Sequence, residues 1–160
     1  FTFTIRKRRT TEKPTETSLE LPKHLRLAKK LIQYIYNDSL TLGLSTITDI
    51  QSLFKVDFKS KSNALAFSET YNNNVLLSGL FLFKGERLSN VYFDYVYSDT
   101  TSKEFSINTK TVKSIITGLY NEPSSVATVP LSTSYGWNNT PIVLEMYSDG
   151  FSVFLEKSNL

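Results

Sequence analysis

The run PIVLEMYS (141–148), Asp149-Gly150 and the run FSVFLEKS (151–158) together place a two-residue turn between two segments that alternate apolar and polar residues. Alternation with a period of two is typical of β-strands that bury one face. Asp-Gly between two such runs favours a type I′ hairpin, because glycine adopts a positive φ without steric cost. This stretch therefore predicts an antiparallel hairpin, and with it a sheet at the centre of the fold.

The same alternation continues toward the amino terminus. Candidate strands are KVDF (55–58), NALAFSE (63–69), NVLLSGLFLF (74–83), RLSNVYFDYVY (87–97) and EFSI (104–107). The run at 74–83 is apolar on both faces, which is typical of a central strand. Lys84-Gly85-Glu86 is expected to form the turn that follows it. One further edge strand is expected within 123–139.

Three segments instead repeat their apolar residues every three or four positions, which predicts helices at 22–37, 46–54 and 109–121. The sequence thus predicts an α+β fold with a single antiparallel sheet of four to six strands, packed on two main helices and one short helix. Residues 1–20 are interpreted as a basic arm and polar linker, and residues 21–160 as one compact domain. The expected core residues are Ile32, Ile35, Leu80, Leu82, Phe93, Tyr95, Val112, Ile116, Leu144 and Val153.

Composition narrows the possible chemistry. The 160 residues include no cysteine and one histidine, so disulfides, thiolate metal sites and cysteine nucleophiles are excluded. His24 stands beside Lys23 and Leu25 with no orienting partner nearby in the sequence, and it is interpreted as an ordinary surface histidine. No metal-binding, phosphate-binding or nucleophile motif is present. The sequence therefore predicts a non-enzymatic protein without a cofactor or bound metal.

Positive charge is concentrated near the amino terminus, where residues 1–30 contain nine Lys or Arg and three Glu. A basic cluster of this kind can contact phosphates, which makes a nucleic-acid-binding domain the alternative function. The aromatic residues that stack on single-stranded bases are missing between these charges. A solvated helix face and a membrane-flanking cluster are the other interpretations. The candidate basic patch is Arg6, Lys7, Arg8, Arg9, Lys23, Arg26 and Lys30.

The period of two also divides the side chains of the sheet between its faces. If the more apolar set packs on the helices, Tyr92, Asp94, Tyr147 and Phe154 share the opposite face. Aromatic residues mixed with carboxylates are typical of recognition surfaces, so these four are the candidate partner-binding residues. The alternative is that they stabilise the sheet through cross-strand pairs or lie beneath a second layer.

The carboxyl-terminal half has a recognisable order: SGLFLFKGERLSNVYFDY, the helix TVKSIITGLYNEPSS, YGW, and the final hairpin. It resembles small exported bacterial proteins and lipoproteins in which a strand hairpin leads to a helix ending L-x-x-x-Y-G-x-P, followed by a Trp-containing segment and a last hairpin. The segment 119–123 departs from that pattern, since it lacks the glycine and shortens the spacing.

The resemblance implies an extracytoplasmic domain that binds a protein partner, itself or the cell envelope, and it transfers no catalytic residue. A cytoplasmic location is expected instead if Arg6–Arg9 flank an upstream membrane helix. By analogy of element order alone, NTF2-like and RWD-like domains remain fold alternatives.

Overall fold

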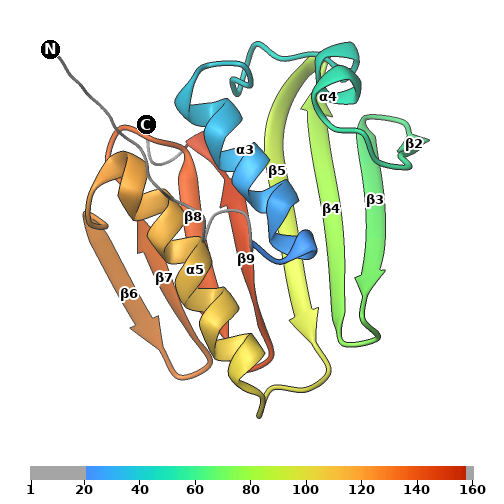
Figure 1. Ribbon diagram of the computed structural model, residues 1–160. Coiled ribbons are helices and arrows are strands. Elements are labelled where there is room, and N and C mark those ends of the chain that lie inside the picture. The colour runs from blue at the N-terminus through green and yellow to red at the C-terminus, as the bar shows by residue number, and fades with distance from the viewer. Residues whose placement is uncertain (1–20, 158–160) are drawn as a thin grey trace, which may run out of the picture.

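The computed structural model describes residues 21–157 and contains one antiparallel sheet of eight strands (Figure 1). The strands are β2 (Lys59–Lys61), β3 (Ala64–Tyr71), β4 (Val75–Lys84), β5 (Arg87–Tyr97), β6 (Ser125–Val129), β7 (Ser132–Gly136), β8 (Ile142–Tyr147) and β9 (Gly150–Leu155). Their order across the sheet is β2-β3-β4-β5-β9-β8-β7-β6. Two four-strand meanders thus meet in the middle, where β5 pairs with β9.

The α+β class is as expected, but the predicted count of four to six strands is wrong. The extra strands lie toward the two edges of the sheet, where side chains are exposed and apolar alternation is weak. All three residues of β2 and all five of β6 are exposed. In 123–139 the sequence indicated one strand, whereas β6 and β7 form a complete hairpin. KVDF (55–58) is not a strand, and pairing begins only at Lys59.

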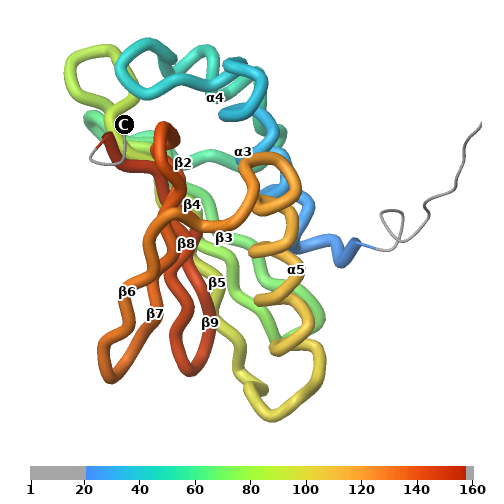
Figure 2. The backbone as a smooth tube through the Cα atoms, turned by 90° about the vertical axis from the view of Figure 1, so that its left-hand side faces the viewer, coloured from blue at the N-terminus to red at the C-terminus, as the bar shows by residue number. Residues whose placement is uncertain are grey.

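The helices all lie on the same face of the sheet (Figures 1 and 2). They are the 3-10 turn η2 (Lys23–Leu25), α3 (Arg26–Tyr36), α4 (Ile47–Leu53) and α5 (Lys103–Tyr120). A Thr46–Asp49 capping box starts α4, as its spacing predicted. The helices leave the other face of the sheet uncovered by any residue in 21–157.

Helix α5 begins six residues before its predicted start, so EFSI (104–107) is helical and the strand expected there is wrong. Phe105 packs its ring 5.1 Å from that of Tyr97 and begins the buried stripe that Val112 and Ile116 continue. Asn108 and Thr109 fill the buried positions between them. Two polar residues on the inner side of the helix concealed its period from the sequence.

Eight of the ten expected core residues are buried, and Leu80 and Leu82 are the exceptions. The buried alternate set of β4 is instead Val75, Leu77, Phe81 and Phe83. A strand that is apolar on both sides has no alternation from which its inward face can be identified. The structure therefore places Leu80 and Leu82, half-buried, on the uncovered face.

The carboxyl-terminal hairpin is present, but its predicted type I′ turn is wrong. Gly150 does not have a positive φ; it is the first residue of β9 and pairs with Val96. A β-carbon at Gly150 would collide with the carbonyl oxygen of Tyr95, so the glycine permits close approach of two backbones. Positive φ angles occur instead at Asn72 and Asn73, between β3 and β4.

Candidate functional site

The structure places Tyr92, Asp94, Tyr147 and Phe154 on the uncovered face, where they come from three neighbouring strands. Tyr92 pairs with Phe154 across β5 and β9, and their rings stack with centroids 5.9 Å apart. Asp94 accepts a hydrogen bond from the hydroxyl of Ser152, two residues along the same strands. Tyr147 donates a hydrogen bond of 2.8 Å to Glu145 on β8.

The register joins these residues to apolar neighbours that sequence reasoning did not include. Ala66 pairs with Leu80, Leu80 pairs with Tyr92, and Phe154 pairs with Val143, so one line of side chains crosses five strands. We call it the apolar row; its members are Ala66, Leu80, Tyr92, Phe154 and Val143. Lateral alignment of this kind depends on register, which cannot be determined from the alternation within each strand alone.

A polar row runs beside the apolar row. Its members are Ser68, Ser78, Asp94, Ser152, Glu145 and Ser134. Glu145 accepts hydrogen bonds from Tyr147 and from the hydroxyl of Ser132, which is 2.8 Å away. Burial and the hydrogen bond to Glu145 raise the pKa of the Tyr147 phenol above 10.0. Neither row contains Lys or Arg between β3 and β8; in register, the basic residues of this face begin at its edge, where Lys59 pairs with Ala66.

Beyond the polar row, large apolar side chains reach solvent. Leu76 is 42% exposed, Val96 is 45% exposed and Tyr147 is 39% exposed. Leu76 and Val96 are paired directly across β4 and β5. The uncovered face therefore presents apolar surface on both sides of a line of carboxylates and hydroxyls, an arrangement that suits contact with another molecule.

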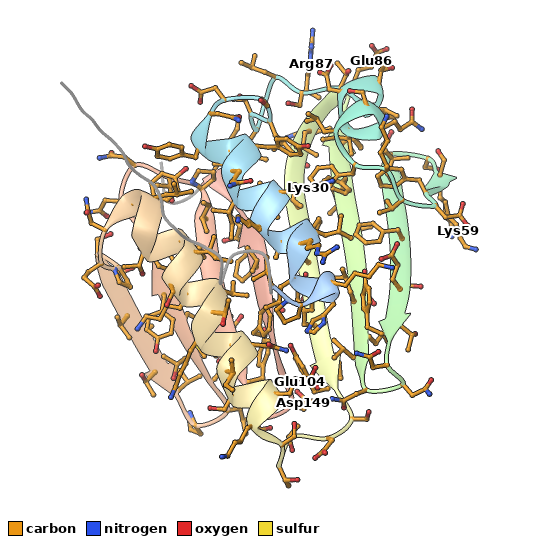
Figure 3. All side chains as sticks on the ribbon, viewed as in Figure 1. Lys30, Lys59, Glu86, Arg87, Glu104 and Asp149 are labelled. Atoms are coloured by element: carbon orange, nitrogen blue, oxygen red, sulfur yellow. The ribbon has the colours of Figure 1, made fainter. Side chains whose placement is uncertain are left out.

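The candidate basic patch is described only in part. Lys23, Arg26 and Lys30 are exposed on η2 and α3, on the helical side of the molecule rather than the uncovered face; Figure 3 labels Lys30. Arg6, Lys7, Arg8 and Arg9 lie outside the described residues. The structure therefore brings together three of the seven basic residues and separates them from the four aromatic and acidic candidates.

His24 is buried, with 2% of its surface exposed, so the expectation of a surface histidine is wrong. Asn108 Nδ2 lies 2.9 Å from His24 Nε2, and the Tyr97 hydroxyl lies 3.2 Å from the same nitrogen. The Tyr95 hydroxyl donates a hydrogen bond of 2.6 Å to the His24 carbonyl oxygen. The spacing of helix residues could not reveal this network, because its partners are more than 70 residues away in the sequence.

Burial is the larger influence on His24 and lowers its pKa below 6.5, while the nearby Glu104 carboxylate opposes that shift. A neutral imidazole fits the contacts, because Nε2 then accepts from the Asn108 amide. Burial likewise raises the pKa of Tyr97 to about 12. The network thus consists of neutral groups that hold η2 and α5 against β5.

Lowering the pH from 7.5 to 5.5 is expected to lower the melting temperature. The pKa of His24 is lower in the folded than in the unfolded protein, so the unfolded state binds the extra proton first. This contribution to stability is present above about pH 6.5 and is lost as the pH falls toward the folded pKa. Calorimetric melting of the wild type and of His24→Gln, which cannot titrate there, should show a flatter pH dependence in the variant.

Because His24 is the only histidine, its ring proton signal in an NMR titration reports the folded pKa without assignment. A midpoint at or above 6.5 would contradict the argument even if the variant did not fold.

Within residues 21–157, no three His, Asp or Glu side chains converge as the ligands of a metal ion would. In the same range no helix has the length and apolarity required to cross a membrane.

Comparison of the chain with family models, curated proteins and solved structures found no match. The resemblance to exported bacterial proteins therefore remains a prediction from the order of sequence segments.

Proposed function

We propose that this chain is a non-enzymatic protein-interaction module that binds a partner through the uncovered face of its sheet. The observation that supports the proposal is the apolar row together with exposed Leu76, Val96 and Tyr147, on a face that no helix of residues 21–157 covers. Aromatic side chains at the centre of such a face can anchor a partner. Hydrogen-bonded carboxylates beside them can give the contact its orientation.

The carboxylates of the uncovered face favour a partner that carries positive charge. Asp94 and Glu145 lie next to the apolar row, and no Lys or Arg stands beside them in either row from β3 to β8. A partner that places Lys or Arg opposite these carboxylates gains attraction, whereas an acidic partner is repelled. The preferred partner is therefore a protein segment with apolar side chains followed by basic ones. A second copy of this face would bring its own Asp94 and Glu145 close to those of the first, which disfavours self-association.

The extracytoplasmic, bacterial setting implied by the resemblance belongs to the same proposal. Fractionation of cells that produce the full-length protein tests it. The nucleic-acid alternative is tested by an electrophoretic shift assay over a salt series, where tight binding with a steep salt dependence would favour that function over this one.

Replacing Tyr147 and Phe154 together by serine should abolish partner binding while the protein still folds. Both side chains are on the uncovered face, so their loss removes anchors without opening the helix-side core. The probe is a phage-displayed random peptide library selected on immobilised wild-type protein. The selected peptides should combine apolar residues with Lys or Arg, and their affinity for the double variant should fall at least about tenfold, which corresponds to about 1.4 kcal/mol.

The matched control replaces Leu44 and Ile107 together by serine. Both are exposed apolar residues on other parts of the molecule. This control should bind the peptides as the wild type does. Peptides that bind the Tyr147/Phe154 variant undiminished would refute the proposal. Concentration-dependent dimers in sedimentation, lost in that variant, would show that a second copy occupies the face. Unfolding of that variant would show that the face is part of the stabilising core.

A further inference from the structure

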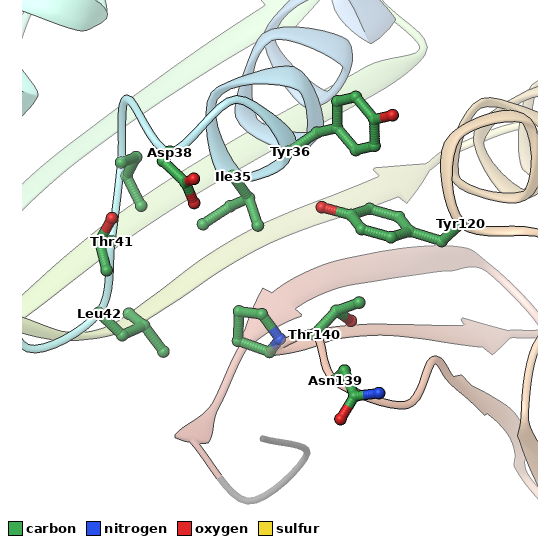
Figure 4. A pocket seen from close by; sticks show the side chains of 10 residues that line it. Ile35, Tyr36, Asp38, Thr41, Leu42, Tyr120, Asn139 and Thr140 are labelled. Atoms are coloured by element: carbon green, nitrogen blue, oxygen red, sulfur yellow. The ribbon is translucent and has the colours of Figure 1, made fainter.

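A cavity of about 310 Å³ lies where helices α3 and α5 end (Figure 4). Its walls come from the last turn of each helix, from the loop after α3 and from residues 139–141 before β8. Ile35 and Leu42 supply apolar lining, while Asp38, Thr41 and Tyr120 supply oxygen atoms. At about 30 Å³ for each water-sized group, this volume suits a ligand of up to roughly ten non-hydrogen atoms.

The electrostatics of the cavity favour a cation. Two helix carboxyl ends meet here, each carrying partial negative charge on its last carbonyl groups. Neither α3 nor α5 has a basic residue in its last turn to offset that charge. Among the described lining residues there is no Lys, Arg or His, whereas Asp38 adds a full negative charge.

The polar groups at the cavity are available to a ligand. Asp38 is exposed, and within residues 21–157 its carboxylate makes no hydrogen bond or ion pair, while its backbone N–H bonds to the carbonyl of Ile35. The Tyr120 hydroxyl points into the cavity (Figure 4), and its ring packs edge-on against Tyr36 with centroids 5.4 Å apart. Burial, with Asp38 and Tyr36 nearby, raises the pKa of Tyr120 to about 12, so the phenol stays neutral.

Three residues around the cavity have a positive φ, and one of them lies in a region that is unfavourable for any residue but glycine. Asp38 and Asn139, on opposite sides, have φ angles of 63° and 64°. Asn121, directly after Tyr120, has φ 69° and ψ −164°, a region that mainly glycine adopts. Its carbonyl accepts a 3.0 Å hydrogen bond from the Trp137 indole, which fixes the end of α5. Such strain is concentrated at ligand-binding sites in proteins.

We propose that this cavity binds a small primary amine as its ammonium ion. The ammonium group donates hydrogen bonds to the Asp38 carboxylate and the Tyr120 hydroxyl oxygen, and the alkyl part packs on Ile35 and Leu42. An ammonium ion has three donors and no acceptor, which matches oxygen atoms that converge without a cation. The site is separate from the uncovered sheet face, since the sheet lies between that face and the helices.

The experiment uses butylammonium chloride as the probe and 1-butanol as its neutral counterpart. Trp137 is the only tryptophan and is hydrogen-bonded to Asn121 beside Tyr120, so its fluorescence reports on the cavity. We expect butylammonium to change the Trp137 fluorescence saturably, with a dissociation constant of about 1 mM for so small a ligand. Butanol should bind at least about tenfold more weakly, since it lacks the charge that Asp38 attracts.

Asp38→Asn should weaken butylammonium binding about tenfold or more and leave butanol binding unchanged, because asparagine also tolerates the positive φ but carries no charge. Tyr120→Phe should weaken butylammonium binding by removing one acceptor. Asp149→Asn is the matched control, since this exposed aspartate lies beyond the far end of β8, and should bind as the wild type does. Equal binding of both probes, no saturable response to butylammonium, or undiminished binding by Asp38→Asn would each overturn the proposal.

Discussion

Replacing Phe93 by alanine is expected to lower the free energy of unfolding by about 3–5 kcal/mol, as large-to-small changes at buried aromatic residues do. Phe93 is fully buried at the centre of the sheet. Its ring lies 5.9, 5.5 and 5.7 Å from the rings of Phe54, Phe67 and Phe81. Alanine would leave a cavity among three aromatic rings from three different elements, which cannot all close on it.

Chemical unfolding followed by circular dichroism measures this effect. Phe58→Ala is the matched control: its ring contacts the same cluster, 5.9 Å from both Phe67 and Phe81, but it is only partly buried. Because less buried apolar surface is lost at Phe58, the control should lower the free energy of unfolding clearly less than Phe93→Ala does. A loss at Phe93 no larger than that of the control would show that the four rings do not form the centre of the core.

Substitution of Gly150 by alanine is expected to lower the free energy of unfolding by about 3 kcal/mol, near the upper end of the range for overpacking. The added methyl group would collide with the carbonyl oxygen of Tyr95, and it would lie 2.9 Å from the Tyr95 carbonyl carbon and 3.2 Å from the Val96 Cα. These atoms belong to the backbone of β5, which is paired on both sides. Relief therefore requires that β5 and β9 separate locally, where the two meanders join.

Gly118→Ala provides a control with the opposite sign. Gly118 lies inside α5, and a β-carbon there meets no atom within 4 Å. Alanine should stabilise the protein by up to about 1 kcal/mol through its greater helix propensity. Thermal unfolding of both variants measures the two shifts. If Gly150→Ala melts at or above the wild-type temperature, the close approach of β5 and β9 is not required for the fold.

Both substitutions affect β5: Phe93 belongs to this strand, and Gly150 lies opposite it on β9. The pairing of β5 with β9 joins segments that are far apart in the sequence, and it also aligns Tyr92 with Phe154 on the uncovered face. Loss of that pairing would therefore remove the proposed binding surface together with the core beneath it. A variant designed to test binding must for this reason change only side chains on the uncovered face.

Local pattern in the sequence was sufficient to predict that helices occur at 22–37, 46–54 and 109–121, strands at 63–69, 74–83 and 87–97, and a terminal hairpin, although the bounds of these elements shifted in the structure. Each depends on a period within one segment, and that period reflects which side chains a helix or strand must bury. It also predicted which residues of β5, β8 and β9 face away from the helices. Those strands have an apolar side and a mixed side, so their inward face can be identified.

Only the tertiary structure decided the features that depend on segments distant in the sequence. The inward face of β4 was set by its neighbours, because both of its sides are apolar. The burial of His24 depends on Tyr97 and Asn108, and polar residues inside α5 concealed where that helix begins. The apolar row depends on the register between strands. The cavity depends on α3 and α5 ending side by side. Periodicity within a segment carries no information about which distant segment will pack against it, and that packing determined each of these features.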